Sequence, residues 1–354
     1  MQHIVQQFSE TIRSASEKQA ALRIRGGGSK DFYGGKLQGE IFDTRPYSGI
    51  VQYEPTELVI TARAGTPLAE MEAALKERGQ MLAFEPPHFG DHATLGGCIA
   101  AGLCGPRRAT VGAVRDFVLG VRMLDGRGND LRFGGQVMKN VAGYDVSRLM
   151  VGSLGTLGLI LEVSLKVLPR PLAEVTLRFE FPEDKVIQML NQWAGRPLPI
   201  SASAYTDGKL GLRLSGAAAA IEAACKKLGG ERIDDAQAEK FWVGIREQTD
   251  PFFRGEAPLW RLSVKSTAPP LKLPGVQLIE WGGSLRWLKS GADAKTIREA
   301  AVSAGGHATL FRASDKSAGA FQPLPPALLK IHRNLKRNFD PTGILNRGRL
   351  YPEF

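Results

Sequence analysis

The chain has 354 residues, 43% of them hydrophobic, so it can bury a substantial core in two or three domains, and wholesale disorder is excluded. Its net charge of +10 suits an anionic partner. The lysines and arginines are dispersed, however, and no basic tract is interleaved with aromatics, which favours a solvated basic surface over nucleic-acid binding.

The three cysteines, Cys98, Cys104 and Cys225, form no CxxC spacing. They are predicted to be reduced thiols, and the chain is not expected to ligate an iron–sulfur cluster by itself. Neither a signal-peptide core nor an apolar run of membrane-spanning length is present. These features predict a cytoplasmic protein with no integral membrane segment.

The first elements are a helix near Val5–Lys18 and a short strand, Ala21–Arg25, that enters Gly26-Gly27-Gly28-Ser29-Lys30. Phosphate sites often form where a strand enters a glycine loop, because successive N–H groups can point at one anion. The spacing matches neither the Walker pattern nor GxGxxG, which argues against a P-loop NTPase and a Rossmann fold. A plain surface turn remains the alternative.

A strand is predicted over Leu58–Ala64, followed by a helix that Thr66 caps and Pro67 begins. Beyond this helix His88 and His92 stand four residues apart, a spacing that suits a metal on a helix. The nearby prolines and Gly90 disfavour a helix there, so a loop is expected and no metal site.

The stretch Ala93–Gly112 shows neither helical nor strand periodicity and consists mainly of small residues. Closely spaced glycines let the backbone approach a ligand and adopt positive φ. Arg107 and Arg108 near its end could help to hold an anion. A ligand loop is therefore predicted, with a flexible linker or a tightly packed glycine turn as the alternative.

A hairpin is predicted from Asp116–Leu124 and Asp130–Phe133, which flank a turn containing Gly126. A further glycine cluster, Gly152–Gly158, precedes a strand over Leu159–Val167 whose apolar residues alternate. That strand should lie on a core. The prolines that follow it place a domain boundary near residue 170.

From residue 174 onward a β-α-β-β-α order, with an alanine-rich helix over Ala217–Leu228, predicts an antiparallel sheet with helices on one face. A looser run of strands and a helix extends to Phe311. A proline-rich linker then leads to a helix over Ala327–Asn338 and a closing segment at Asn346–Tyr351. The predicted units are residues 1–170, 171–322 and 323–354.

Several of these segments together resemble FAD-binding proteins of the vanillyl-alcohol oxidase and p-cresol methylhydroxylase (PCMH) type. The matching segments are Arg25–Ser29, Ala93–Gly97, Asp125-Gly126, Gly143-Tyr144-Asp145, Gly152–Ile160 and Asn346–Tyr351. Within that family, further segments resemble the FAD-binding subunits of bacterial glycolate oxidases: Pro46–Gly49, Tyr53–Gly65, Glu85–His88, Gly105–Arg108, Arg115–Gly120 and Gly134–Gly152. The resemblance implies an α+β fold. A trimmed PCMH-type FAD-binding domain (1–170) is followed by an α+β, ferredoxin-like cap domain (171–322), and a C-terminal helix and tail (323–354) return to the FAD domain.

The resemblance also implies a site for FAD. Arg25–Ser29 would be the first diphosphate loop, Thr94–Gly97 the second, and Gly152–Ile160 the wall beside the isoalloxazine. The residues expected to bind the cofactor are Arg25, Gly26, Gly27, Gly28, Ser29, Pro87, Thr94, Leu95, Gly96, Gly97, Gly102, Gly105, Arg107, Gly112, Gly152, Gly155, Thr156, Gly158, Ile160 and Asn346. Relatives that attach FAD covalently often have histidine after the first glycine loop, and Ser29 stands there, so noncovalent FAD is expected.

The His-Gly-Asp-Gly-Asn-x-His metal motif of related 2-hydroxy-acid dehydrogenases has no counterpart here. The segment most similar to this motif contains His307, which is expected to be structural or to line a pocket rather than to bind a metal. Trp260, Arg261 and Arg312 are candidates to face the flavin, and arginine suits a carboxylate. No catalytic acid or base is assigned.

By this resemblance the chain would be the FAD-binding subunit of a complex that oxidises glycolate or a related 2-hydroxy acid to the 2-oxo acid. Its partners would be a larger FAD- and substrate-binding subunit and an iron–sulfur subunit. Through these partners the chain could also attach peripherally to the inner membrane. Two alternatives stay open: a self-sufficient FAD-dependent 2-hydroxy-acid dehydrogenase, and a non-catalytic scaffold subunit.

Overall fold

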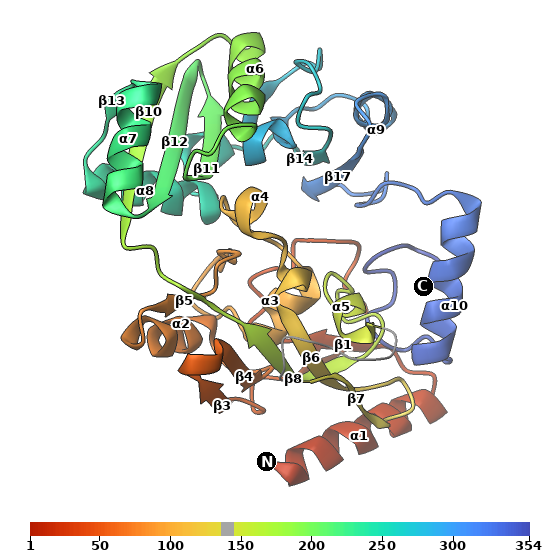
Figure 1. Cartoon of the computed structure of the whole chain (residues 1–354). Helices are drawn as coiled ribbons and strands as arrows, with labels where there is room; N and C mark the ends of the chain where they lie inside the picture. Colours follow the sequence, from red (N-terminus) through yellow and green to blue (C-terminus); the bar gives the residue numbers. More distant parts are fainter. Residues whose placement is uncertain (136–144) are drawn as a thin grey trace.

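The computed structural model describes residues 1–135 and 145–354. Two sheet-based bodies lie one above the other, joined near residue 170 (Figure 1). We refer to residues 1–170 as the N-terminal domain and to residues 171–322 as the cap. The motif residues Gly143 and Tyr144 fall outside the described part of the chain.

The N-terminal domain is built on a five-stranded antiparallel sheet. Its strand order is β3 (Ile50–Glu54), β4 (Val59–Arg63), β8 (Leu159–Lys166), β6 (Val118–Leu124) and β7 (Asp130–Gly134). Strands β1 (Leu22–Arg25) and β2 (Glu40–Asp43) form a parallel pair, and β5 (Gln80–Met81) pairs with β9 (Leu168–Pro169). The helical segments are α1 (Gln2–Glu17), η1 (Pro55–Glu57), α2 (Leu68–Glu77), α3 (Leu95–Ala101), α4 (Arg108–Val111), η2 (Val114–Asp116) and α5 (Val146–Leu149).

Two apolar clusters bury the two faces of this sheet. Leu68, Met71 and Leu75 of α2 belong to the cluster that also contains Leu95 and Ile99 of α3. A second cluster joins α1 and β1 to the C-terminal segment. The alternation in 159–167 is confirmed as a strand, and because the chain covers it on both sides its residues are nearly all buried.

The cap is an eight-stranded antiparallel sheet with helices on both faces. Its strand order is β13 (Glu231–Arg232), β10 (Ala173–Glu180), β12 (Lys209–Gly216), β11 (Ile200–Thr206), β15 (Val276–Glu280), β16 (Leu285–Lys289), β14 (Leu259–Ser263) and β17 (His307–Arg312). Its helical segments are α6 (Glu183–Ala194), α7 (Ala218–Leu228), α8 (Asp235–Arg246), η3 (Pro251–Phe253), η4 (Trp281–Gly283) and α9 (Ala294–Ser303). Helices α6, α7 and α9 pack on the face away from the N-terminal domain.

The other face of the cap sheet packs toward the N-terminal domain through one shared apolar cluster. Trp242 of α8, Trp287 of β16 and Phe311 of β17 lie there with Leu103 and Leu154 from the N-terminal domain. Helix α8 was not foreseen, and the expectation that all cap helices share one face is wrong for it. Between the strands β15 and β16 of the predicted looser run lies the short helical segment η4.

The C-terminal segment returns to the N-terminal domain, as the fold class predicts. Helix α10 (Pro326–Phe339) runs down beside that domain (Figure 1), and Leu345 then pairs in parallel with Leu22 of β1. The Leu22 amide donates to the Ile344 carbonyl at 2.8 Å, and the Asn346 amide donates to the Leu22 carbonyl at 2.9 Å. The tail thus extends the β1–β2 pair at the edge beside β1.

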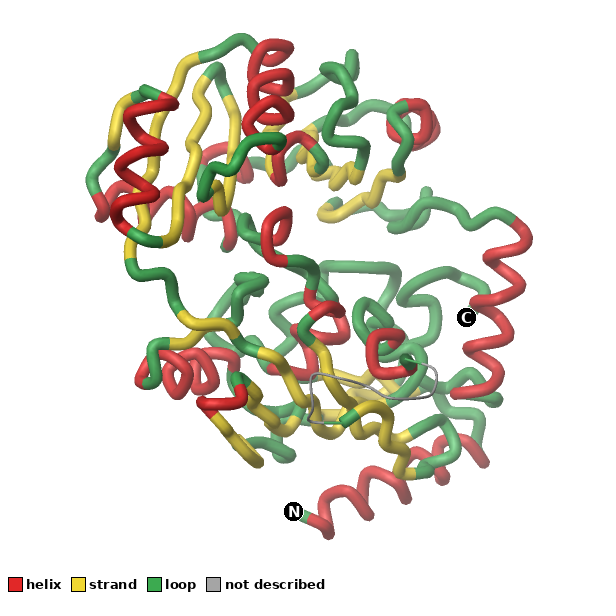
Figure 2. The backbone as a smooth tube through the Cα atoms, viewed as in Figure 1, coloured by secondary structure: helices red, strands yellow, loops and turns green. Residues whose placement is uncertain are grey.

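Two local expectations are corrected. The stretch 93–112 is not free of regular structure, because Leu95, Cys98 and Ile99 recur at helical spacing and bury one side of α3, visible as helix in Figure 2. Thr66 does not cap α2. Pro67 occupies the N-cap position, and the Thr66 hydroxyl accepts a hydrogen bond from the Gly49 amide at 2.9 Å.

Candidate functional site

A cleft opens in the N-terminal domain where β1 ends, beside α3 and the returning tail. The predicted site residues that line it are Arg25, Gly26, Gly27, Gly28, Ser29, Thr94, Gly96, Gly97, Gly155, Gly158, Ile160 and Asn346. Segments from the start, middle and end of the chain therefore meet at one cavity. Lining residues that the sequence analysis missed are Ile24, Asp31, Leu37, Thr44, Ala64, Ala100, Ala101 and Arg349, and Lys30 and Leu154 line the cleft from within the predicted segments.

The loop Gly26–Lys30 has the chemistry of an anion cradle. Within residues 1–135 and 145–354, the amides of these consecutive residues donate no hydrogen bond to another group of the chain. The loop is nevertheless held firmly, because the Asp31 amide donates to the Gly28 carbonyl at 3.0 Å and the Asp31 carboxylate pairs with Arg25 and Arg23. A row of unused N–H donors at a cleft suits a phosphate group, whose oxygens would accept from them.

The start of α3 contributes a wall without side chains rather than hydrogen-bond donors. The amides of Leu95 and Gly96 donate to the carbonyls of Thr66 and Ala64, and the Gly97 amide donates to the Thr94 hydroxyl at 3.3 Å. An added Cβ at Gly97 would meet only that hydroxyl, also at 3.3 Å, whereas one at Gly96 would meet Ala64 at 2.7 Å. Packing within the protein therefore does not demand a glycine at position 97. Because Gly97 has no side chain, it leaves room in the cleft.

Gly27 is different, because an added Cβ there would lie 1.4 Å from the His92 carbonyl oxygen. The first glycine loop is thus packed against the chain that leads into α3. Gly28 adopts a φ of +74°, which glycine tolerates best. At Gly27 and Gly28, therefore, glycine is needed for the packing and backbone conformation of the loop, and not only to make room for a ligand.

The returning tail closes the cleft from the third side. The buried Asn346 side chain accepts a hydrogen bond from the Ile24 amide and donates one to the Leu154 carbonyl, at 2.7 and 2.6 Å. Arg349 donates to the carbonyls of Tyr33 and Gly35, and burial lowers its pKa to about 10. Arg349 escaped prediction because nothing in its local sequence signals that it reaches the loop after β1.

The remaining predicted site residues do not line this cleft. Leu95 is fully buried in the core and Thr156 donates to the Ser153 carbonyl. Gly102 ends α3 beside Gly152, and Gly112 lies against Asp116. The other three, Pro87, Gly105 and Arg107, lie at the boundary with the cap.

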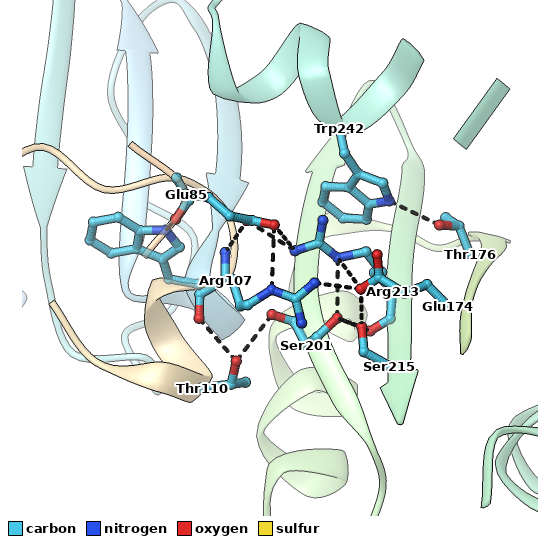
Figure 3. A network of polar contacts seen from close by, with 11 residues as sticks. Glu85, Arg107, Thr110, Glu174, Thr176, Ser201, Arg213, Ser215 and Trp242 are labelled. Atoms are coloured by element: carbon cyan, nitrogen blue, oxygen red, sulfur yellow. Dashed lines mark hydrogen bonds and ion pairs between the residues drawn. The ribbon is translucent and has the colours of Figure 1, made fainter. Parts of the chain in front are cut away.

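Arg107 belongs to a polar network that joins the two bodies (Figure 3). The carboxylate of Glu85 accepts from the Arg107 amide at 2.9 Å and from the Arg213 guanidinium at 2.8 and 3.0 Å. Arg107 also pairs with Glu174 of β10, and Arg213 donates to the Ser201 hydroxyl at 3.1 Å. Because Glu85 belongs to the N-terminal domain and Arg213 to β12, this network fixes the cap on the domain below it.

His88 and His92 lie in a loop, as expected, and the imidazole of His88 is 3.2 Å from the Glu72 carboxylate. Over the described ranges, no group of three or more histidine, cysteine or acidic residues is arranged to hold a metal ion. In the same part of the chain, no helix has the length and apolarity needed to cross a bilayer.

Comparison with known proteins agrees with this geometry. Residues 3–134 match the family model FAD_binding_4, an FAD binding domain. The chain is 51% identical over 348 residues to the glycolate oxidase subunit GlcE of Escherichia coli (strain K12), covering 98% of this chain and 97% of that one. It is 28% identical over 273 residues to the glycolate oxidase subunit GlcD of Bacillus subtilis (strain 168), covering 68% and 57%.

The fold has solved counterparts. An alkyldihydroxyacetonephosphate synthase structure matches with a TM-score of 0.64 at 16% identity, over 96% of this chain and 73% of that one. The family model and the relatives place the chain among FAD-dependent oxidoreductases with a PCMH-type FAD-binding domain. More narrowly, the chain belongs to the family of the glycolate oxidase subunit GlcE, which confirms the resemblance found in the sequence.

Proposed function

We propose that this chain is the FAD-binding subunit of a complex that oxidises glycolate or a related 2-hydroxy acid to the 2-oxo acid. The observation that carries the proposal is the row of unused amides at Gly26–Lys30 in a cleft of a chain that is 51% identical to a glycolate oxidase subunit along its whole length. Bound flavin would supply the two-electron acceptor. The protein supplies position and electrostatics.

Individual residues have separable roles in this proposal. The amides of Gly26–Lys30 hold the diphosphate, Gly97 leaves room beside it, and Asn346 fixes the strand from which the cradle begins. FAD is held noncovalently, because Ser29 stands where covalent relatives carry histidine. Residues 1–170 act as the FAD domain, 171–322 as the cap and 323–354 as the returning segment.

We also propose two partners: a larger subunit similar to GlcD that carries the main substrate site, and an iron–sulfur subunit that passes electrons onward. Support for the first comes from the similarity of this chain to both GlcE and GlcD. A reduced flavin holds two electrons that must pass to an acceptor, and the acceptor that we propose is an iron–sulfur cluster, which takes them one at a time. The complex would attach to the inner membrane peripherally, through these partners.

The visible spectrum of the purified chain tests the cofactor assignment, followed by the spectrum of the supernatant after acid precipitation. Flavin absorbance that moves into the supernatant supports noncovalent FAD. Colour that stays in the pellet contradicts the role of Ser29, and a colourless chain that regains no colour with added FAD contradicts the function. Glycolate oxidation by the chain with and without a GlcD-like partner then separates a subunit from a self-sufficient enzyme.

A further inference from the structure

Residues 85–89, which we call the bridging loop, are tied to the cap at both of their ends. Glu85 and Phe89 have φ angles of +48° and +54°, a backbone conformation that residues other than glycine rarely adopt. The carboxylate of Glu85 accepts from Arg213 of β12 (Figure 3), and the amide of Phe89 donates to the Glu247 carboxylate at 2.8 Å. A strained conformation persists only where its surroundings hold it. Here two charged side chains of the cap hold the ends of the loop.

Glu247 has an unfavourable position for a carboxylate. It follows α8 directly as the C-cap residue, where the partial negative charge of the helix terminus repels an anion. Its side chain is 16% exposed and accepts from the amides of His88 and Phe89 at 3.0 and 2.8 Å, and from the Arg246 guanidinium at 2.7 Å. The donors that stabilise this carboxylate thus include two consecutive amides of the other domain.

One peptide group carries the contact of Glu247 onward to the cofactor cleft. The N–H of Phe89 and the C=O of His88 belong to the same planar peptide group. The N–H donates to Glu247, and the C=O accepts from the Lys30 ammonium at 3.2 Å. A carboxylate on one side of a peptide group polarises it and strengthens the hydrogen bond on the other side. The orientation of this single peptide plane therefore links the position of Lys30 to that of Glu247.

Lys30 is the last residue of the glycine loop and lines the cleft. An ammonium group has three donors. Those of Lys30 reach the His88 carbonyl at 3.2 Å and the Ser29 hydroxyl at 3.4 Å, which leaves one donor without an acceptor among the described residues. Burial lowers the pKa of Lys30, whereas Cys98 and Glu247 act to raise it. A positive charge with a free donor beside the unused amides suits an anionic group of a ligand.

Phe89 holds the bridging loop against the same part of the chain. Its ring packs edge-on against that of Phe32, two residues after Lys30, with the ring centroids 5.5 Å apart. The Lys30 ammonium itself lies 5.6 Å from the Phe89 ring centroid. A shift of the loop would therefore move Lys30 as well.

We propose that Glu247 of the cap is a positioning residue for the cofactor: through the bridging loop it holds the Lys30 ammonium toward the anionic group of bound FAD. FAD binding and the seating of the cap on the N-terminal domain are then coupled, since both favour the same orientation of the peptide between His88 and Phe89. The identity of the anion, the FAD diphosphate, rests on the proposed function of the chain. The contacts of Glu247, the loop and Lys30 do not depend on it.

The first test is titration of the flavin-depleted chain with FAD, followed by flavin fluorescence. Glu247→Ala should weaken FAD binding by about tenfold, because Lys30 loses its fixed position, although Glu247 itself is not a lining residue of the cleft. The matched control is Glu239→Ala, which removes an exposed carboxylate from α8 and should change the affinity by less than about twofold. Wild-type affinity in Glu247→Ala, or an equal loss in Glu239→Ala, overturns the proposal.

A milder variant covers the case in which Glu247→Ala does not fold. Glu247→Gln keeps one oxygen that can accept from the loop amides but removes the charge, so FAD binding should weaken by about threefold. Circular dichroism establishes the fold of each variant. An unchanged FAD affinity in a folded Glu247→Gln overturns the proposal.

A double-mutant cycle tests whether Glu247 acts through Lys30. Lys30→Met should weaken FAD binding by about tenfold, because it removes the ammonium and retains an unbranched stem. In that background, Glu247→Ala should cause no further loss of affinity. Losses that simply add in the double variant would show that Glu247 acts by another route and would overturn the proposal.

Hydrogen exchange of the bridging loop supplies a readout that a purely structural role would not change. Because residues 86 and 87 are prolines, the amides of His88 and Phe89 provide most of the exchange in a peptide that covers the loop. Saturating FAD should slow this exchange by about fivefold or more in the wild type and leave it unchanged in Lys30→Met. Protection by FAD that persists in Lys30→Met overturns the coupling.

The proposed function and the role of Glu247 fail in different ways. A wild-type chain that binds no FAD contradicts both. A wild-type chain that binds FAD, with an affinity that does not respond to the Glu247 variants, contradicts the role of Glu247 alone.

Discussion

The side chain of Asn346 accepts a hydrogen bond from the amide of Ile24 at 2.7 Å, so a residue of the returning tail fixes the strand that leads into the Gly26–Lys30 loop. Asn346→Ala should lower the free energy of unfolding by about 1–3 kcal/mol, because it leaves the half-buried Ile24 amide and the buried Leu154 carbonyl without partners. It should also lower flavin content. Urea unfolding and flavin absorbance measure both, and Asn334→Ala, at an exposed position on α10, is the control. Full flavin occupancy in Asn346→Ala would contradict the role of Asn346 in holding this strand for the cofactor.

Gly97 offers the cleanest test of the cleft. Gly97→Val should fold but lose most of its flavin, since its side chain would occupy cleft space and its Cβ would meet only the Thr94 hydroxyl within the protein. Gly291→Val, at an exposed glycine whose Cβ would contact nothing, should keep both fold and flavin. The measurements are flavin absorbance per chain and circular dichroism. A fully flavinated Gly97→Val would show that the cofactor lies elsewhere.

Gly27→Val, by contrast, should not give a folded chain lacking flavin. The added carbon would collide with the His92 carbonyl, so the expected outcome is loss of stable protein. Circular dichroism of the expressed protein distinguishes the two cases. A well-folded Gly27→Val would mean that the loop and the chain before α3 can separate.

The network around Glu85 should control how firmly the cap is held. Arg213→Met is expected to destabilise the chain by about 3–5 kcal/mol, because it leaves part of the Glu85 charge without a buried partner. The double variant Glu85→Gln with Arg213→Met should recover part of that loss. Urea unfolding of the single and double variants gives the coupling. Strict additivity would show that the two residues do not act together.

Lys316 gives a pH-dependent prediction. Its ammonium donates to the carbonyls of Phe32, Gly34 and Phe311, and burial, together with repulsion from Arg349 and Arg312, lowers its pKa to about 8. Between about pH 8 and pH 10.5 the unfolded chain binds this proton more tightly, so Lys316 makes stability rise with pH across that window. Lys316→Met should reduce the slope of unfolding free energy against pH there. An identical slope in both proteins would contradict the assignment.

Local sequence was enough to predict the glycine loop and the strands around it, because a strand that enters consecutive glycines is specified within a few residues. The cofactor was predicted only from the resemblance of several segments together to a known family. Local sequence was not enough for α3, where small residues masked a helical spacing of only three apolar positions, nor for α8. Arg349 could not be found either. Its role arises from partners far away in the chain, and no local pattern marks a guanidinium that reaches a distant loop.

The pairing of Leu345 with Leu22 has a consequence for biosynthesis. The loop that would hold the diphosphate leaves the ribosome long before the segment that flanks its strand is made. The strand entering the cradle therefore lacks one neighbour until that segment has been made. Flavin should load only after the segment around Leu345 has emerged and paired, so a product terminated before it would not sequester the cofactor.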